Sequence, residues 1–202
     1  KGQPPNGEPI GFMAMIPVML ATEDELSEAL AVRLLAELNG AIAGPTKLRK
    51  NGFGYLKSKM SNWREVARRQ MMLVLTDLDQ AECVVAFRQE WLGQQPVPAN
   101  LVFRVAVREV ESWVLADHEA LRKLLGSKIQ CPAAPDTLPD PKQYLLKQAQ
   151  KAPRNVRDEL VAQKGAMASQ GLGYNRCLVD WVNQEWSPER AAGLSPSLQR
   201  AR

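Results

Sequence analysis

Long apolar runs separated by amphipathic segments give the chain its main pattern. Three of these runs, residues 13–21, 71–77 and 100–109, have the length and composition of strands that are buried on both faces. A shorter apolar stretch at 40–44 predicts a further short strand. Because the runs alternate with helical patterns, we expect βαβ units around a mostly parallel central sheet flanked by helices, which is the α/β class.

The segments between the runs have helical patterns. In residues 22–40 leucines recur at helical spacing behind several acidic residues, and a glycine ends the segment. Further helices are predicted at 62–70, 81–93 and 109–126. Residues 45–59 are basic and interrupted by glycines, which predicts a loop.

The last third of the chain has a different composition. Prolines recur through residues 131–143 and exclude a continuous helix or a central strand, so we interpret this segment as a connector with turns. Helices are predicted at 141–152 and 176–186, and Ser187, followed by proline, predicts the start of another. The chain then divides into an α/β core at 10–126 and, at 127–202, a proline-rich connector and helical extension packed on the core.

Composition and charge limit the cellular compartment and the binding partners that we expect for the chain. The chain has 202 residues, 45% of them hydrophobic, which is enough for one sizeable core. Its formal net charge of +4 permits a polyanionic partner without requiring one. The three cysteines are far apart, which predicts neither a disulfide framework nor a zinc cluster and fits a reducing cytoplasm. The longest apolar run is interrupted by Pro17 and is too short to span a membrane, so we expect no membrane partner.

Carboxylates follow two of the predicted strands. Asp77 and Asp79 come directly after an apolar run, and Glu23 follows the first strand one βαβ unit earlier. Parallel strands deliver ligand-binding groups at their carboxyl ends, so we expect these three side chains to converge. Carboxylate oxygens suit Mg²⁺ or Mn²⁺, which makes the three residues candidate metal ligands. The alternative is that Thr76, Asp77 or Asp79 caps the following helix.

This arrangement resembles the Toprim domain of topoisomerases, primases and OLD-family nucleases. In that domain a glutamate after the first strand and a D-x-D after the third strand bind Mg²⁺ for phosphodiester chemistry. Asp24 stands where the Toprim pattern has glycine, so Glu23, Asp24 and Glu25 compete for the role of first ligand.

A wider resemblance covers nearly the whole chain from about Met15. The segments "EDELSEALAVRLL", "LVLTDLDQ", "REVESWVLAD" and "SPERAAGLSPSL" are similar, in that order, to an uncharacterised bacterial family related to domain of unknown function 4276. The resemblance implies a Toprim-like fold and an ATPase partner in mobile or anti-phage gene clusters. It also favours Glu111 as an additional metal ligand, although Glu109 and Glu111 fit equally well as acids in the first turn of a helix.

A second group of candidate residues is basic and surrounds a glycine-rich stretch. Its cationic members are Lys47, Arg49, Lys50, Lys57 and Lys59. A flexible cationic loop of this kind can follow a phosphate backbone while Tyr55 or Phe53 stacks on a base. The alternative is a solvated loop with one packed aromatic residue.

Two functions from different classes are compatible with these patterns. The first is a Mg²⁺-dependent, Toprim-like nuclease or phosphodiesterase that acts on nucleic acid, with Glu23, Asp77 and Asp79 as its catalytic residues. The second is a non-catalytic module that keeps the fold and recruits a partner protein such as an ATPase. The intact Asp-Leu-Asp sequence favours the first function, and Asp24 and the lack of an obvious general base favour the second.

Overall fold

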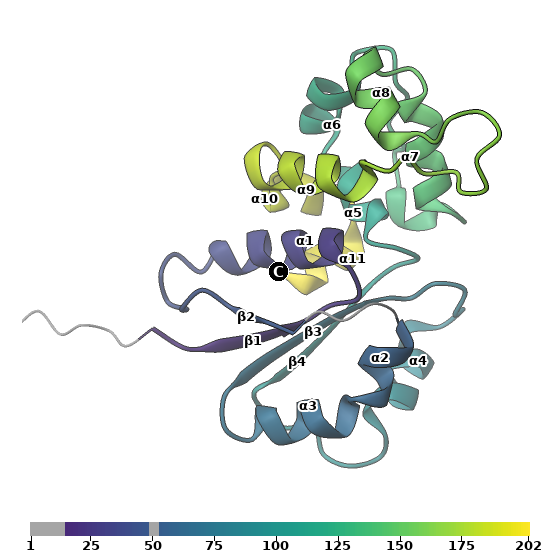
Figure 1. Ribbon diagram of the computed structural model, residues 1–202. Coiled ribbons are helices and arrows are strands. Elements are labelled where there is room, and N and C mark those ends of the chain that lie inside the picture. Colours follow the sequence, from purple (N-terminus) through teal and green to yellow (C-terminus); the bar gives the residue numbers. More distant parts are fainter. Residues whose placement is uncertain (1–14, 49–52) are drawn as a thin grey trace, which may run out of the picture.

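The computed structural model describes residues 15–48 and 53–202, and its centre is a four-stranded parallel sheet (Figure 1). The strands are β1 (Val18–Ala21), β2 (Thr46–Lys47), β3 (Met71–Asp77) and β4 (Leu101–Ala106), in the spatial order β2-β1-β3-β4. Val18 of β1 lies opposite Met71 of β3, and Met72 lies opposite Leu101 of β4. The predicted α/β class with a parallel central sheet is confirmed and is consistent with a Toprim-like fold.

Helices cover both faces of the sheet (Figure 1). One face carries α2 (Phe53–Ser58), α3 (Met60–Ala67) and α4 (Val84–Leu92). On the other side lie α1 (Glu25–Ala36), α5 (Glu111–Ala116), α6 (His118–Leu125), η1 (Pro135–Thr137), α7 (Pro141–Ala149), α8 (Arg154–Leu160), α9 (Tyr174–Gln184), α10 (Pro188–Ala192) and α11 (Pro196–Ala201). Of these, α6, α7 and α8 form an outer layer that is stacked on the other helices (Figure 1). The predicted C-terminal helical extension is therefore present and packs on the α1 side of the sheet.

β3 does not alternate between apolar and polar residues, because both of its faces are buried. Met72 and Val74 pack in the hydrophobic cluster on the side of α2 to α4, whereas Leu73 and Leu75 pack in the cluster on the side of α1. Met71, at the start of the strand, is only half-buried. A strand covered in this way needs apolar residues at every position until its end leaves the core.

Indole groups join the C-terminal helices to the rest of the core. The Nε1–H of Trp186 donates to the carbonyl oxygen of Trp113 at 3.1 Å, and the Nε1–H of Trp113 donates to the hydroxyl of Ser197 at 2.8 Å. Both tryptophans are fully buried. One continuous hydrophobic cluster contains these side chains together with Leu20 and Leu75 of the sheet.

Two predictions near the start of the chain need correction. The first strand begins at Val18, because Pro17 has no N–H to donate to a ladder, and residues 13–14 lie outside the described residues. The predicted strand at 40–44 is reduced to an isolated bridge between Ile42 and Ile16, and β2 follows it at Thr46–Lys47.

The predicted loop at 45–59 is also wrong in part, because it contains β2 and the helix α2. Leu56 of α2 is completely buried, and its carbonyl oxygen accepts a hydrogen bond from Trp63 Nε1–H at 3.1 Å. The burial of one leucine among glycines and lysines therefore stabilises a helix where composition indicates a loop.

The predicted helix 109–126 breaks at the buried Asp117. The Asp117 side chain caps α6 by accepting from the N–H of Ala120 at 3.2 Å, and it accepts from the N–H of Ser187 at 2.8 Å. The guanidinium of Arg190 binds both carboxylate oxygens, at 2.9 and 2.8 Å. Asp117 thus ends α5, starts α6 and holds α10.

Among the described residues no helix is both long and apolar enough to cross a membrane.

Asp117→Ala should lower the free energy of unfolding by about 3 kcal/mol, because buried N–H groups lose their acceptor and Arg190 loses its partner. Urea unfolding of the two proteins measures the difference. Asp158→Ala is the control, because Asp158 is exposed and pairs with Arg154 only one helical turn away. Equal unfolding curves for wild type and Asp117→Ala would contradict the role given to Asp117.

Candidate functional site

Glu23 joins the loop after β1 to the end of β3. Its Oε1 accepts hydrogen bonds from the hydroxyl of Thr76 and from the N–H of Asp77, the latter at 3.1 Å. Asp24 has a different role, because it is the N-cap of α1 and its Oδ1 accepts from the N–H and the hydroxyl of Ser27 at 2.8 and 2.7 Å. Glu23, and not Asp24, is therefore the acid that faces β3.

Asp77 connects the end of β3 to the loop after β4. Its Oδ1 accepts a hydrogen bond from the N–H of Val110 at 2.9 Å. The next residue, Glu111, is buried in the first turn of α5, and its Oε1 accepts from the hydroxyl of Tyr174 at 2.8 Å. The loops after three neighbouring strands therefore bring carboxyl groups to one edge of the sheet. We call Glu23, Asp77, Asp79 and Glu111 the acidic cluster.

Asp79 lies in a constrained part of the site and does not cap α4. The N-cap of that helix is Cys83, and it makes no side-chain capping bond. Asp79 and Arg108 both have positive φ angles, 50° and 62°, which non-glycine residues rarely adopt and which aspartate tolerates better than arginine. The Asp79 N–H donates to the Arg108 carbonyl oxygen at 2.8 Å, and the Arg108 guanidinium donates to the carbonyl oxygens of Asp79 and Ala81 at 3.0 and 3.1 Å.

Desolvation and mutual repulsion act together on the acidic cluster. Burial raises the pKa of Asp77 well above its usual range, and the charges of Glu111 and Glu23 raise it further. Burial also raises the pKa of Glu23, where Asp79 adds to the effect and the hydrogen bond from Thr76 opposes it. The pKa of Asp79 is raised by burial. These side chains are near enough to interact electrostatically, as their positions at neighbouring strand ends predict.

Glu111 is the member of the cluster that is buried closest to the C-terminal helices. Burial raises its pKa to about 7, and the nearby Lys142 opposes this effect. The backbone N–H of Lys142 donates to Oε2 of Glu109 at 3.0 Å, and its ammonium lies 5.1 Å from the centroid of the Tyr174 ring. Lys142 and Tyr174 belong to the C-terminal helices. The sequence does not predict them as site residues, because nothing in the local pattern shows that these helices reach the cluster.

The chemistry of the cluster suits a hard divalent cation, although its side chains are not gathered around one point. Within residues 15–48 and 53–202, no three His, Cys, Asp or Glu side chains are arranged to hold a metal ion. The hydrogen bonds described above use one oxygen each of Glu23, Asp77 and Glu111. For the part of the chain that the structure describes, the second oxygen of each accepts none, so these carboxylates retain donor atoms for an ion such as Mg²⁺.

The predicted basic residues are largely occupied by contacts within the protein. The ammonium of Lys47 pairs with Glu28 at 3.1 Å, and that of Lys57 pairs with Glu90. The Tyr55 ring packs edge-on against Trp63, with 6.2 Å between the ring centroids. Lys59 is half-buried at the N-cap of α3, while Arg49 and Lys50 lie outside the described residues. The packing of Tyr55 against Trp63 agrees with the alternative to nucleic-acid binding, in which this segment has one packed aromatic residue.

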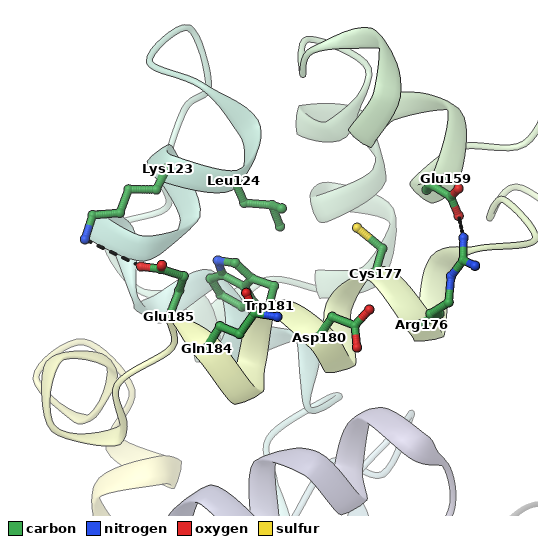
Figure 2. Close-up of a pocket in the computed structure, with 9 residues that line it drawn as sticks. All are labelled: Lys123, Leu124, Glu159, Arg176, Cys177, Asp180, Trp181, Gln184 and Glu185. Atoms are coloured by element: carbon green, nitrogen blue, oxygen red, sulfur yellow. Dashed lines mark hydrogen bonds and ion pairs between the residues drawn. The ribbon is translucent and has the colours of Figure 1, made fainter.

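A separate surface hollow of about 520 Å³ lies between α6, α8 and α9 (Figure 2). Two ion pairs border it: Arg176 binds Glu159 at 2.8 Å, and Lys123 binds Glu185 at 3.7 Å. No residue of the acidic cluster lines this hollow. Four of its charged lining residues are engaged in these two ion pairs, and it lacks the neighbouring buried carboxyls of the acidic cluster, which therefore remains the better candidate site.

Comparison of the chain with protein-family models, with curated proteins and with solved structures finds no match.

Glu111→Gln should flatten the dependence of stability on pH. Because the folded state raises the pKa of Glu111 from 4.5 to about 7, the unfolded chain releases this proton first, and stability falls as pH rises through that interval. The full loss, roughly 3 kcal/mol, is present only above the folded pKa. Glutamine cannot ionise and keeps an oxygen that accepts from Tyr174, so the variant should gain stability relative to wild type as pH rises.

Urea unfolding at several pH values between about 4.5 and 8 measures this difference. Glu82→Gln, at an exposed position, is the matched control and should follow wild type throughout. A constant offset between Glu111→Gln and wild type at every pH would contradict the raised pKa of Glu111.

Proposed function

We propose that the protein is a Mg²⁺- or Mn²⁺-dependent, Toprim-like nuclease or phosphodiesterase that acts on nucleic acid. The observation that carries the proposal is the direct hydrogen bonding between Glu23 and the end of β3, which brings the acids of two neighbouring strand ends together. Ligand sites of parallel sheets lie at this carboxyl edge. Raised pKa values in a group of neighbouring carboxyls also favour a functional site.

Each residue of the acidic cluster has a role in this proposal. Glu23, Asp77 and Asp79 would hold the ion, and Glu111 would be an additional ligand. A bound Mg²⁺ lowers the pKa of its water and stabilises the charge that develops on a phosphodiester. The hydroxyl of Thr76 and the N–H of Val110 hold Glu23 and Asp77 by one oxygen each and leave the other oxygen available.

The proposal also includes a nucleic-acid substrate, a cellular location and a partner protein. The net charge of +4 and the basic residues near α2 are compatible with a nucleic-acid substrate. Lys59, Arg49 and Lys50 are the better candidates for phosphate contacts, because Lys47 and Lys57 already have carboxylate partners. We place the protein in the bacterial cytoplasm, in an anti-phage or mobile-element system with an ATPase partner.

A second function is supported by a specific observation. The carboxylates are not arranged around a common point in the described residues, and Asp24 is used as a helix cap. Both features fit a non-catalytic module that keeps the fold and recruits a partner protein.

Asp77→Asn should abolish Mg²⁺-dependent cleavage without unfolding the protein. Asparagine keeps an oxygen that can accept from Val110 N–H, and it removes a charge that is disfavoured by burial and by Glu111. We expect an unchanged or higher melting temperature and no cleavage of labelled single- or double-stranded DNA and RNA with Mg²⁺ or Mn²⁺. Asp158→Asn, at an exposed position on α8, is the control and should cleave like wild type.

The same proteins distinguish the two functions by metal titration. For a metal enzyme, Mg²⁺ or Mn²⁺ raises the melting temperature of wild type and not that of Asp77→Asn. No metal-dependent shift in either protein, together with no cleavage, would exclude the enzyme and leave the recruiting module.

Lys59→Ala should reduce the salt dependence of nucleic-acid binding more than Lys57→Ala. A lysine that binds phosphate contributes about 0.7 to the slope of log K against log salt for a single strand, because counterions are released. Lys57 already pairs with Glu90, so its replacement should change the slope less. Binding of labelled oligo(dT) at several salt concentrations measures both slopes, and equal slopes for wild type and Lys59→Ala would remove Lys59 from the interface.

A further inference from the structure

β4 is the outer strand of the sheet on the side away from β1, and every second residue of it directs its backbone groups outward. The N–H of Met72 donates to the carbonyl oxygen of Asn100, and the N–H of Leu78 donates to that of Ala106, both at 2.9 Å. Because hydrogen bonding alternates along a parallel pair, the even-numbered residues of β4 face β3. The N–H and C=O groups of Phe103 and Val105 therefore point away from the sheet.

Side chains cover part of this edge, so that Phe103 is only 1% exposed, whereas Val105 is 8% exposed. The guanidinium of Arg88 donates to the carbonyl oxygen of Phe103 at 2.6 Å, and the hydroxyl of Ser197 accepts from the N–H of Val107 at 3.5 Å. Between them, no group of the described residues forms a hydrogen bond with the outward N–H and C=O of Val105. An open strand edge of this kind can pair with another extended chain.

A groove between α4 and α11 runs along this edge and has a volume of about 510 Å³. Its apolar lining includes Val84, Val85 and Val107, and Val85 is 63% exposed. Its charged lining residues are Arg88, Arg104 and Arg200, and none of the described residues that line it is acidic. The groove thus combines unpaired backbone groups, apolar surface and positive charge.

Two of the arginines oppose one another within the groove. Burial lowers the pKa of Arg104, and the charge of Arg88 lowers it further. The Nε–H of Arg104 donates to the carbonyl oxygen of Ala201 at 3.1 Å. This carbonyl oxygen carries no formal charge, so it does not neutralise the positive charge of Arg104. An anionic group bound in the groove would relieve this repulsion.

We propose that the edge of β4 binds an extended acidic segment of a partner protein as an added strand. The backbone of such a segment pairs with the outward N–H and C=O of Val105, its apolar side chains contact the valines, and its carboxylates contact the arginines. The site does not depend on the acidic cluster or on any metal. It gives the recruiting function a definite partner chemistry, and it is compatible with an enzyme that is delivered by a partner.

Charge and backbone chemistry favour this occupant over two others. A second copy of the chain paired through the same edge would place Arg88, Arg104 and Arg200 of both copies close together, and like charges repel. A nucleic acid could satisfy the arginines, but its backbone lacks the alternating N–H and C=O groups that an open strand edge pairs with.

Fluorescence anisotropy with a short labelled peptide of alternating glutamate and valine tests the proposal in metal-free buffer. We expect saturable binding that weakens with salt, and no binding of the matched lysine–valine peptide. Arg200→Gln and Arg104→Gln should each weaken binding roughly fivefold. Arg154→Gln, at an exposed position on α8, is the charge-matched control and should bind like wild type.

N-methylation distinguishes strand pairing from simple charge attraction. In an added strand only every second peptide N–H faces β4, so methylation of one alternate set should abolish binding and methylation of the other set should preserve it. Equal effects of the two sets, no binding of the acidic peptide, or displacement of the peptide by stoichiometric oligo(dT) would overturn the proposal. Arg200 is exposed on the surface, so its replacement tests the groove without disturbing the core.

Discussion

The burial of β3 on both faces is the constraint on which the rest of the structure depends. A strand that is apolar at every position must be covered by a layer on each side, and here α2 to α4 form one layer while α1 and the C-terminal helices form the other. Pairing with β1 and β4 then places three strand ends side by side. The position of the acidic cluster is thus a consequence of how the core is packed.

The acidic cluster reduces the stability of the fold that creates it. Burial and repulsion raise the pKa values of Glu23, Asp77 and Glu111, which means that their ionised forms are disfavoured. Donors from Thr76 and Tyr174 offset this penalty in part. The positive φ angles of Asp79 and Arg108 add a local backbone cost of about 1–3 kcal/mol each. Proteins retain such costs mainly where they bind ligands or carry out chemistry.

Sequence patterns predict those elements whose structure is determined by residues that are close together in the sequence. The strand at 71–77 is predicted correctly because an unbroken apolar run that ends at a carboxylate is typical of a buried strand leaving the core, and the proximity of Glu23 to Asp77 follows from the parallel order of the strands. The helix α2 is missed because Leu56, which is completely buried, is surrounded by glycines and lysines in the sequence. The contact of Tyr174 with Glu111 spans 63 positions, and no local pattern contains that information.

The location of Trp186 and Leu198 in the same hydrophobic cluster as β1 has a consequence for synthesis of the chain. The ribosome makes β1, β3 and β4 well before the helices that cover one face of the sheet. During that interval Leu20, Leu73 and Leu75 have only α1 and its neighbours to pack against. A nascent chain therefore carries an apolar sheet face that a chaperone can bind, and the face closes only when α9, α10 and α11 have left the exit tunnel.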